Sequence, residues 1–116
     1  MSKKTVYVSG PITHHVGEDP FGPVASLLEA LGHTAVNPKT IGKCHDESCV
    51  KLPHEIERGW DHSWACCLKY DLAAMLMMCD AILMLDGWQD SHGARLELTV
   101  ASAVGLDVMM QKDLYR

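Results

Sequence analysis

Residues 91–97 have the residue types and spacing of an anion site followed by a nucleophile. Ser91 and Gly93 would lie in the first turn of a predicted helix, where unpaired amides and the positive end of the helix dipole attract an anion. Glu97 follows one turn later, where its carboxylate can attack an electrophilic carbon. Two simpler interpretations stay open: Ser91 as an ordinary helix N-cap, and Glu97 as a solvent-facing helix residue.

Further acids complement this segment. Asp71 lies in a predicted helix beside Leu68 and Leu72, which places it near the edge of the core. Asp86 ends a predicted strand, where it can contact a substrate, whereas Asp80 is typical of a turn before a strand. A pair of carboxyl groups can divide nucleophilic and acid/base work between them in glycosyl chemistry.

Ser9, Gly10 and Pro11 end the first predicted strand. A glycine there lets backbone amides approach an anion, although a simple strand-ending turn explains the same residues. The sequence has no Gly-Lys-Ser/Thr loop and no GxGxxG pattern, so the usual signatures of ATP hydrolysis and dinucleotide binding are absent. The indole of Trp88 can stack on a flat base, cover the core as part of a lid, or contact another subunit.

Cysteine and histidine residues gather between positions 44 and 67. The spacings Cys44-x4-Cys49 and His62-x3-Cys66 can bind zinc, but they form neither a regular pair of CxxC motifs nor an HExxH motif. Cysteines packed as small apolar residues are the simpler interpretation. A thiol nucleophile has no partner motif here, so the carboxylates are the stronger candidates for chemistry.

The elements that must position these residues alternate between strand and helix. Hydrophobic patterns predict strands over 4–9, 34–36, 81–85 and 108–111, and helices over 20–31, 64–78 and 92–104. Residues 39–66 are predicted to form a long inserted loop with about one turn of helix. This alternation predicts a small, flavodoxin-like doubly wound α/β domain, with a mostly parallel sheet of four to five strands in the order 2-1-3-4. Such sheets bind ligands beyond the carboxyl ends of their strands, here between the first and third strands.

Length and composition fit one globular domain over residues 1–116, with 47% hydrophobic and 22% charged residues. A net charge of −5 disfavours polymeric nucleic acid as a partner, because proteins hold its phosphates with basic residues. No apolar run reaches the ~18–20 residues that a membrane span needs. The N-terminus shows no signal segment, so we expect a cytoplasmic protein whose five cysteines are reduced.

Several short motifs resemble, in their order and spacing, the nucleoside 2-deoxyribosyltransferase-like superfamily, in particular its small bacterial and phage branch. They are Val6-Tyr7-Val8-Ser9-Gly10-Pro11-Ile12-Thr13, Val36-Asn37-Pro38, Asp71, Cys79-Asp80-Ala81-Ile82, Gly87-Trp88 and Ser91-x-Gly93-Ala94-x-x-Glu97. The superfamily includes deoxyribosyltransferases and 2′-deoxynucleoside 5′-monophosphate N-glycosidases. The resemblance implies the same doubly wound fold, a homodimer or homotetramer, and a reaction that needs neither a cofactor nor a metal.

The resemblance also implies roles for individual residues. Glu97 would be the nucleophile that attacks the anomeric carbon, Asp71 the acid/base, and Tyr7 the residue that positions the nucleophile and sugar. The substrate-binding set would be Ser9, Gly10, Ile12, Asp86, Trp88, Ser91 and Gly93. Within this set, Ser91 and Gly93 match the phosphate-binding SxG of the monophosphate hydrolases, which favours a nucleoside 5′-monophosphate over a nucleoside.

Two positions depart from the resemblance and keep other functions open. Pro11 stands where the hydrolases often have serine, and Thr13 where relatives have arginine or glycine. We therefore expect cleavage or transfer of the N-glycosidic bond of a small nucleoside or nucleotide. The alternatives are a non-catalytic nucleotide-binding or sensor module and a metal-stabilised interaction protein.

Overall fold

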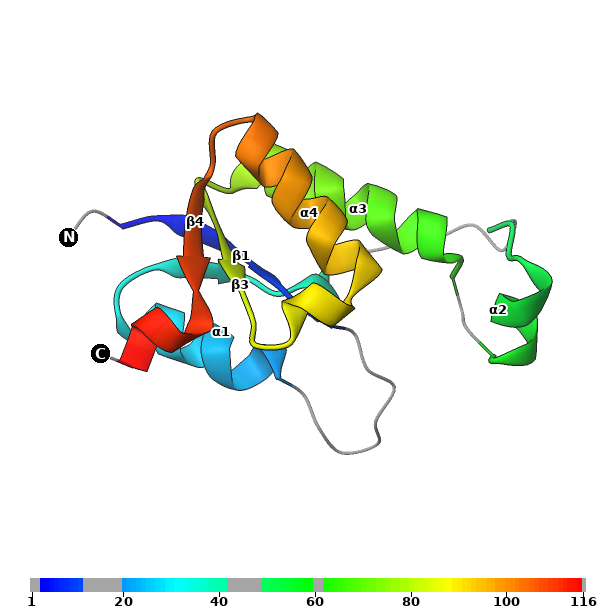
Figure 1. The fold of residues 1–116 in the computed structure, drawn as a ribbon, viewed down its shortest axis with the longest axis horizontal. Coiled ribbons are helices and arrows are strands. Elements are labelled where there is room, and N and C mark those ends of the chain that lie inside the picture. Colours follow the sequence, from blue (N-terminus) through cyan, green and yellow to red (C-terminus); the bar gives the residue numbers. More distant parts are fainter. Residues whose placement is uncertain (1–2, 12–19, 42–48, 60–61, 116) are drawn as a thin grey trace.

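The computed structural model describes residues 3–11, 20–41, 49–59 and 62–115, and its ribbon is drawn in Figure 1. Its strands are β1 (Thr5–Ser9), β2 (Thr34–Val36), β3 (Ala81–Met84) and β4 (Asp107–Met110). Its α-helices are α1 (Phe21–Ala30), α2 (Pro53–Glu57), α3 (Trp64–Met78) and α4 (His92–Ala103). Short 3-10 turns follow β2, β3 and β4 as η1 (Pro38–Thr40), η2 (Trp88–Asp90) and η3 (Gln111–Tyr115).

The four strands form one sheet in the order β2-β1-β3-β4, and every neighbouring pair is parallel. The predicted strand order and the predicted small doubly wound α/β fold are therefore confirmed. The chain moves from β1 outward to β2 and then back across to β3, so strand order reverses between β1 and β3. Crevices of such sheets form at this reversal, beyond the carboxyl ends of the two strands.

Helices cover both faces of the sheet (Figure 1). On one face, α1 packs against Val6 and Val8 of β1 in an apolar cluster that continues into β3. On the other face, α3 and α4 pack against a second cluster, which contains Tyr7. Because side chains of a strand alternate between the two faces, Tyr7 and Ser9 both point toward the face that α4 covers. All four residues of β3 are buried, as its unbroken apolar sequence predicted.

The region predicted as a long loop with about one turn of helix over 39–66 contains more regular structure than predicted. It holds η1, the helix α2 and the beginning of α3. The α2 helix starts with Pro53 in its first turn, a position that tolerates proline because the missing N–H has no partner there. Ser63 begins α3 by accepting a hydrogen bond from the Cys66 N–H at 3.0 Å.

Gly10 is required by packing, a reason that the sequence did not reveal. A Cβ atom at this position would lie 2.7 Å from Leu85 Cβ, which is close to the backbone and cannot swing away. We expect Gly10→Ala to lower the free energy of unfolding by about 1–3 kcal/mol, as overpacking does elsewhere. Urea denaturation measures this loss. Gly93→Ala is the matched control, because its added Cβ would meet only Trp64 Nε1 at 3.9 Å. Equal stability of the Gly10→Ala variant and the wild type would contradict the packing explanation.

Glu55 joins α2 to α3 through two backbone N–H groups. Its buried carboxylate accepts hydrogen bonds from Leu52, at 2.6 Å, and from Trp64. These bonds hold the pKa of Glu55 below its ordinary value of 4.5, and the bond from Leu52 has the larger effect. A lowered pKa in the folded state contributes stability that is complete above 4.5 and is lost as the pH falls through the folded-state pKa.

We therefore expect Glu55→Gln to melt at a lower temperature than the wild type near neutral pH. The difference should shrink as the pH falls below 4.5, because the wild-type carboxylate then becomes protonated as well. Thermal melts followed by circular dichroism across this pH range measure it. Glu57→Gln, an exposed position on the same helix, is the control and should melt with the wild type at every pH. A pH-independent difference for Glu55→Gln would contradict the explanation.

Candidate active site

Glu97 lies inside the molecule, where two hydroxyl groups bind its carboxylate. Its side chain is 6% exposed, so the interpretation of Glu97 as a solvent-facing residue is wrong. Tyr7 donates its hydroxyl to Oε2 at 2.5 Å, and Ser9 donates its hydroxyl to Oε1 at 2.7 Å. Tyr7 and Ser9 are two residues apart on β1, so both reach the same carboxylate from one face of the strand. Each carboxylate oxygen is thereby fixed by a separate donor.

The environment of Tyr7 keeps its hydroxyl in the donor form. Tyr7 is fully buried, and this burial is the largest cause of a strongly raised pKa. The charge of Glu97 raises the pKa further, and Asp71 does the same when it is ionised. A phenol with such a pKa stays protonated throughout the range in which proteins fold, so it continues to donate to the carboxylate.

Asp71 comes from the middle of α3 and is only 4% exposed. Asp71 lies close enough to Tyr7 for its ionised form to raise the pKa of that hydroxyl. We therefore treat Tyr7, Ser9, Asp71 and Glu97 as one set, the Glu97 group. Three chain segments, β1, α3 and α4, thus bring together the three residues that the sequence analysis assigned to catalysis. A phenol and two carboxyl groups can orient a nucleophile and move a proton at an adjacent reacting bond.

The first turn of α4 forms the outer part of the site. Ser91 is its N-cap and accepts a hydrogen bond from the Ala94 N–H at 3.2 Å, so the N-cap interpretation is confirmed. The same serine hydroxyl can still donate its proton, and the amides of the first turn still point outward. The rings of Trp64 and His92 lie side by side here, with centroids 5.5 Å apart. Trp64, like Trp88, is an indole that could stack on a base, and its contact with His92 joins the starts of α3 and α4.

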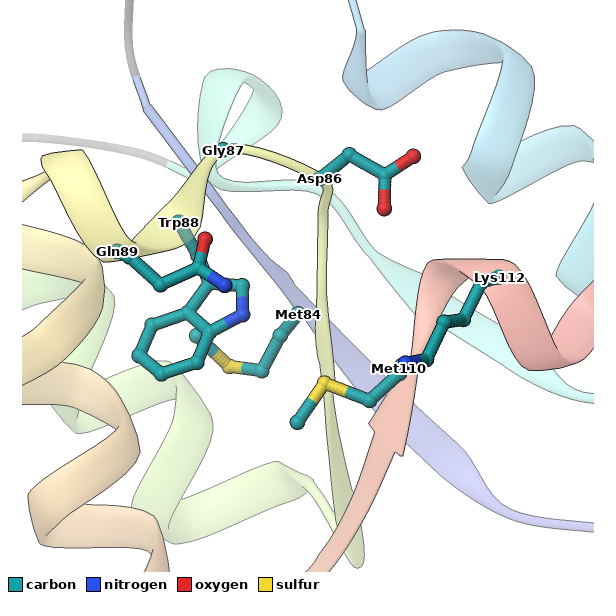
Figure 2. A pocket seen from close by; sticks show the side chains of 7 residues that line it. All are labelled: Met84, Asp86, Gly87, Trp88, Gln89, Met110 and Lys112. Atoms are coloured by element: carbon teal, nitrogen blue, oxygen red, sulfur yellow. The ribbon is translucent and has the colours of Figure 1, made fainter.

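A cavity of about 210 Å³ opens at the carboxyl ends of β3 and β4. Figure 2 shows the residues that line it: Met84, Asp86, Gly87, Trp88, Gln89, Met110 and Lys112. In this view the indole of Trp88 lies beside the two methionines, while the carboxylate of Asp86 points away from the indole. The cavity is smaller than the ~300 Å³ of a typical ligand pocket.

The predicted substrate-binding residues divide into groups. Asp86 and Trp88 line the cavity, and Glu97 is not among its described lining residues. Ser91 and Gly93 lie at the start of α4, the helix that carries Glu97. The Ser9 hydroxyl binds Glu97 and so acts in the structure as a partner of the predicted nucleophile. Gly10 packs against Leu85, and Ile12 lies outside the described residues.

The thiols divide between the core and the start of α3. Cys79 lies at the end of α3, where burial first and the charge of Asp80 second raise its pKa to about 11. It is therefore a protonated core residue and a poor nucleophile. Cys49, His62 and Cys66 place their ligand atoms within 4.8 Å of one another and could hold a metal ion. Cys44 lies outside the described residues.

Comparison with known protein families gives a match over most of the chain. The family model described as "Domain of unknown function (DUF4406)" matches residues 4–110. This range includes every strand of the sheet and all the residues of the Glu97 group. No curated protein and no solved structure matches the chain.

Proposed function

We propose that this chain, which belongs to the DUF4406 family, cleaves or transfers the N-glycosidic bond of a nucleoside 5′-monophosphate or a deoxynucleoside. The observation that carries the proposal is the buried Glu97 carboxylate, held by the hydroxyls of Tyr7 and Ser9 at the carboxyl end of β1. An acid that only stabilised a helix surface would not need two buried hydroxyl donors from another element. A nucleophile does need such fixed orientation, because its attacking oxygen must meet one carbon atom.

In the proposed first step, a Glu97 oxygen attacks the anomeric carbon as the bond from this carbon to the base breaks. The electron pair of the broken bond goes to the base nitrogen, and a protonated Asp71 supplies the base with a proton. The carbon passes through an oxocarbenium-like state, which the negative carboxylate stabilises before the ester bond forms. The product of this step is a glycosyl ester on Glu97 together with a free base.

In the proposed second step, water or another base attacks the anomeric carbon and releases Glu97 as a carboxylate. Asp71, now ionised, accepts the proton of the attacking group and returns to its starting form. Water gives hydrolysis, and a second base gives transfer. The residues of the Glu97 group serve both outcomes, so the acceptor depends on what occupies the space left by the first base.

The start of α4 supports a phosphate group on the substrate. Ser91 can donate its hydroxyl proton, and Gly93 presents no side chain to an approaching anion. The positive end of the helix dipole adds to the attraction. On this basis we propose that a 5′-phosphate lies at Ser91 and Gly93, with the anomeric carbon toward Glu97 and the base toward Trp88.

Chromatography of released base tests the proposal. The full chain is incubated with ribo- and deoxynucleosides and their 5′-monophosphates, with and without an acceptor base. Release from monophosphates supports a nucleotide hydrolase, and exchange only with an acceptor base supports a transferase. Tight nucleotide binding without turnover would replace the proposal with the non-catalytic sensor module. Absence of both binding and turnover across the panel would overturn both functions.

The proposed homodimer or homotetramer is supported by the outer surface of α3. This helix exposes several large apolar side chains, namely Trp64, Tyr70, Leu76, Met77 and Met78. A second copy of the chain would cover them, as obligate interfaces do. Light scattering after size exclusion tests the oligomeric state.

No helix in the described part of the chain is long and apolar enough to cross a membrane. A cytoplasmic location stays a prediction.

A further inference from the structure

We propose that Cys49, His62 and Cys66 bind a structural zinc ion at the beginning of α3. Their ligand atoms all lie within 4.8 Å of one another, and Cys66 Sγ lies 3.9 Å from His62 Nδ1. A tetrahedral zinc ion with bonds of about 2.3 Å to sulfur and about 2.0 Å to nitrogen holds these atoms roughly 3.5–3.8 Å apart. The three side chains therefore need only a small movement to surround the ion.

Hydrogen bonds of Ser63 already connect Cys49 to Cys66. The backbone N–H of Ser63 donates to Cys49 Sγ at 3.2 Å, which is the kind of outer contact that zinc-bound thiolates accept. The Ser63 hydroxyl accepts from the Cys66 N–H and lies 3.6 Å from Cys49 Sγ. Its proton can therefore turn toward the Cys49 sulfur once this sulfur is a thiolate.

The donor set favours zinc over the hard cations. Two thiolates and one imidazole suit zinc, whereas magnesium and calcium prefer oxygen ligands. Cys66 lies in the first turn of α3, where the helix dipole stabilises negative charge. Three protein ligands leave one position of a tetrahedron for water or a further ligand. Cys67, the next residue of the helix, does not belong to the cluster.

The position of the cluster indicates what the ion does. Zinc would join Cys49 to the start of α3 and close the segment that carries α2. Glu55 already joins the same two helices by accepting the Trp64 N–H. Trp64 in turn contacts the ring of His92 at the start of α4. The ion would thus hold the α2 segment beside the outer part of the candidate active site, and it would take no part in the glycosidic reaction.

Zinc content and cobalt spectroscopy test the site without any assay of activity. The full chain, reduced and without a metal-binding tag, is analysed for zinc and then titrated with Co²⁺ alone. We expect one zinc per chain. The Co²⁺-bound protein should show absorption bands from charge transfer between sulfur and cobalt, and bands typical of tetrahedral Co²⁺. His62→Gln and Cys49→Ser should each weaken zinc binding by more than the ~100-fold that loss of an outer contact costs. Cys67→Ser is the matched control and should bind as the wild type does.

Two safeguards keep the test decisive. Circular dichroism shows whether each variant folds, and His62 and Cys49 are both only partly buried, so neither substitution removes a fully buried core side chain. A chelator should lower the melting temperature of the wild type and leave His62→Gln unchanged. A wild type that takes up no zinc in excess, zinc affinity unaffected by both substitutions, or a disulfide between Cys49 and Cys66 under reducing conditions would overturn the proposal.

Discussion

Glu97→Gln is expected to abolish base release, with a loss in kcat of about 10⁴-fold or more. The amide has nearly the shape of the carboxylate but lacks the charge that attacks the anomeric carbon and stabilises the oxocarbenium-like state. Folding should survive, because the glutamine oxygen can accept from Tyr7 while its amide donates to the Ser9 hydroxyl. We expect the free energy of unfolding to change by no more than about 2 kcal/mol. Rates come from chromatography of free base, and stability from urea denaturation.

Glu57→Gln supplies the matched control for this prediction, since it makes the same chemical change at an exposed helix position. A covalent trap adds a second readout. A 2′-fluorinated deoxynucleoside slows hydrolysis of the ester, so intact mass spectrometry should detect one glycosyl group on the wild type, and peptide mapping should place it on Glu97. A folded Glu97→Gln protein with wild-type turnover would remove Glu97 from the mechanism.

Asp71→Asn is expected to slow turnover of ordinary nucleotides by about 10²–10⁴-fold, the usual contribution of a general acid. The loss should depend on the leaving base. A guanine methylated at N7 already carries a positive charge and leaves without a proton, so the variant should cleave this substrate at close to the wild-type rate. The measurement is the ratio of kcat/KM for the methylated and unmethylated substrates. A merely structural role for Asp71 would lower both rates equally.

Asp80→Asn is the control for the Asp71 prediction. Asp80 is exposed and accepts a hydrogen bond from the Thr5 N–H at 3.1 Å, which an asparagine oxygen can also accept. We expect its substrate ratio to match that of the wild type. Equal losses of Asp71→Asn on both substrates, in a folded protein, would assign proton transfer to another group.

Local sequence patterns were sufficient to predict the elements of the sheet. The apolar run over 81–85 and the β-branched run over 4–9 became β3 and β1, and the predicted helix over 64–78 coincides with α3. Parallel order followed from the alternation of strand and helix, because each return to the sheet needs a crossover. The elements of the inserted segment were predicted least well, because α2 is a short helix with no hydrophobic period long enough to reveal it.

Local sequence is enough to put Tyr7 and Ser9 on one face of β1, because side chains of a strand alternate, and to put Glu97 one turn inside α4. That these residues meet depends on the packing of distant elements. Tyr7 and Glu97 are 90 residues apart, and their hydrogen bond depends on how α4 packs on the sheet. The same holds for Gly10 against Leu85 and for Cys49 beside His62 and Cys66. Periodicity fixes the direction of a side chain along its own element, whereas contacts between distant elements depend on the packing of the whole core.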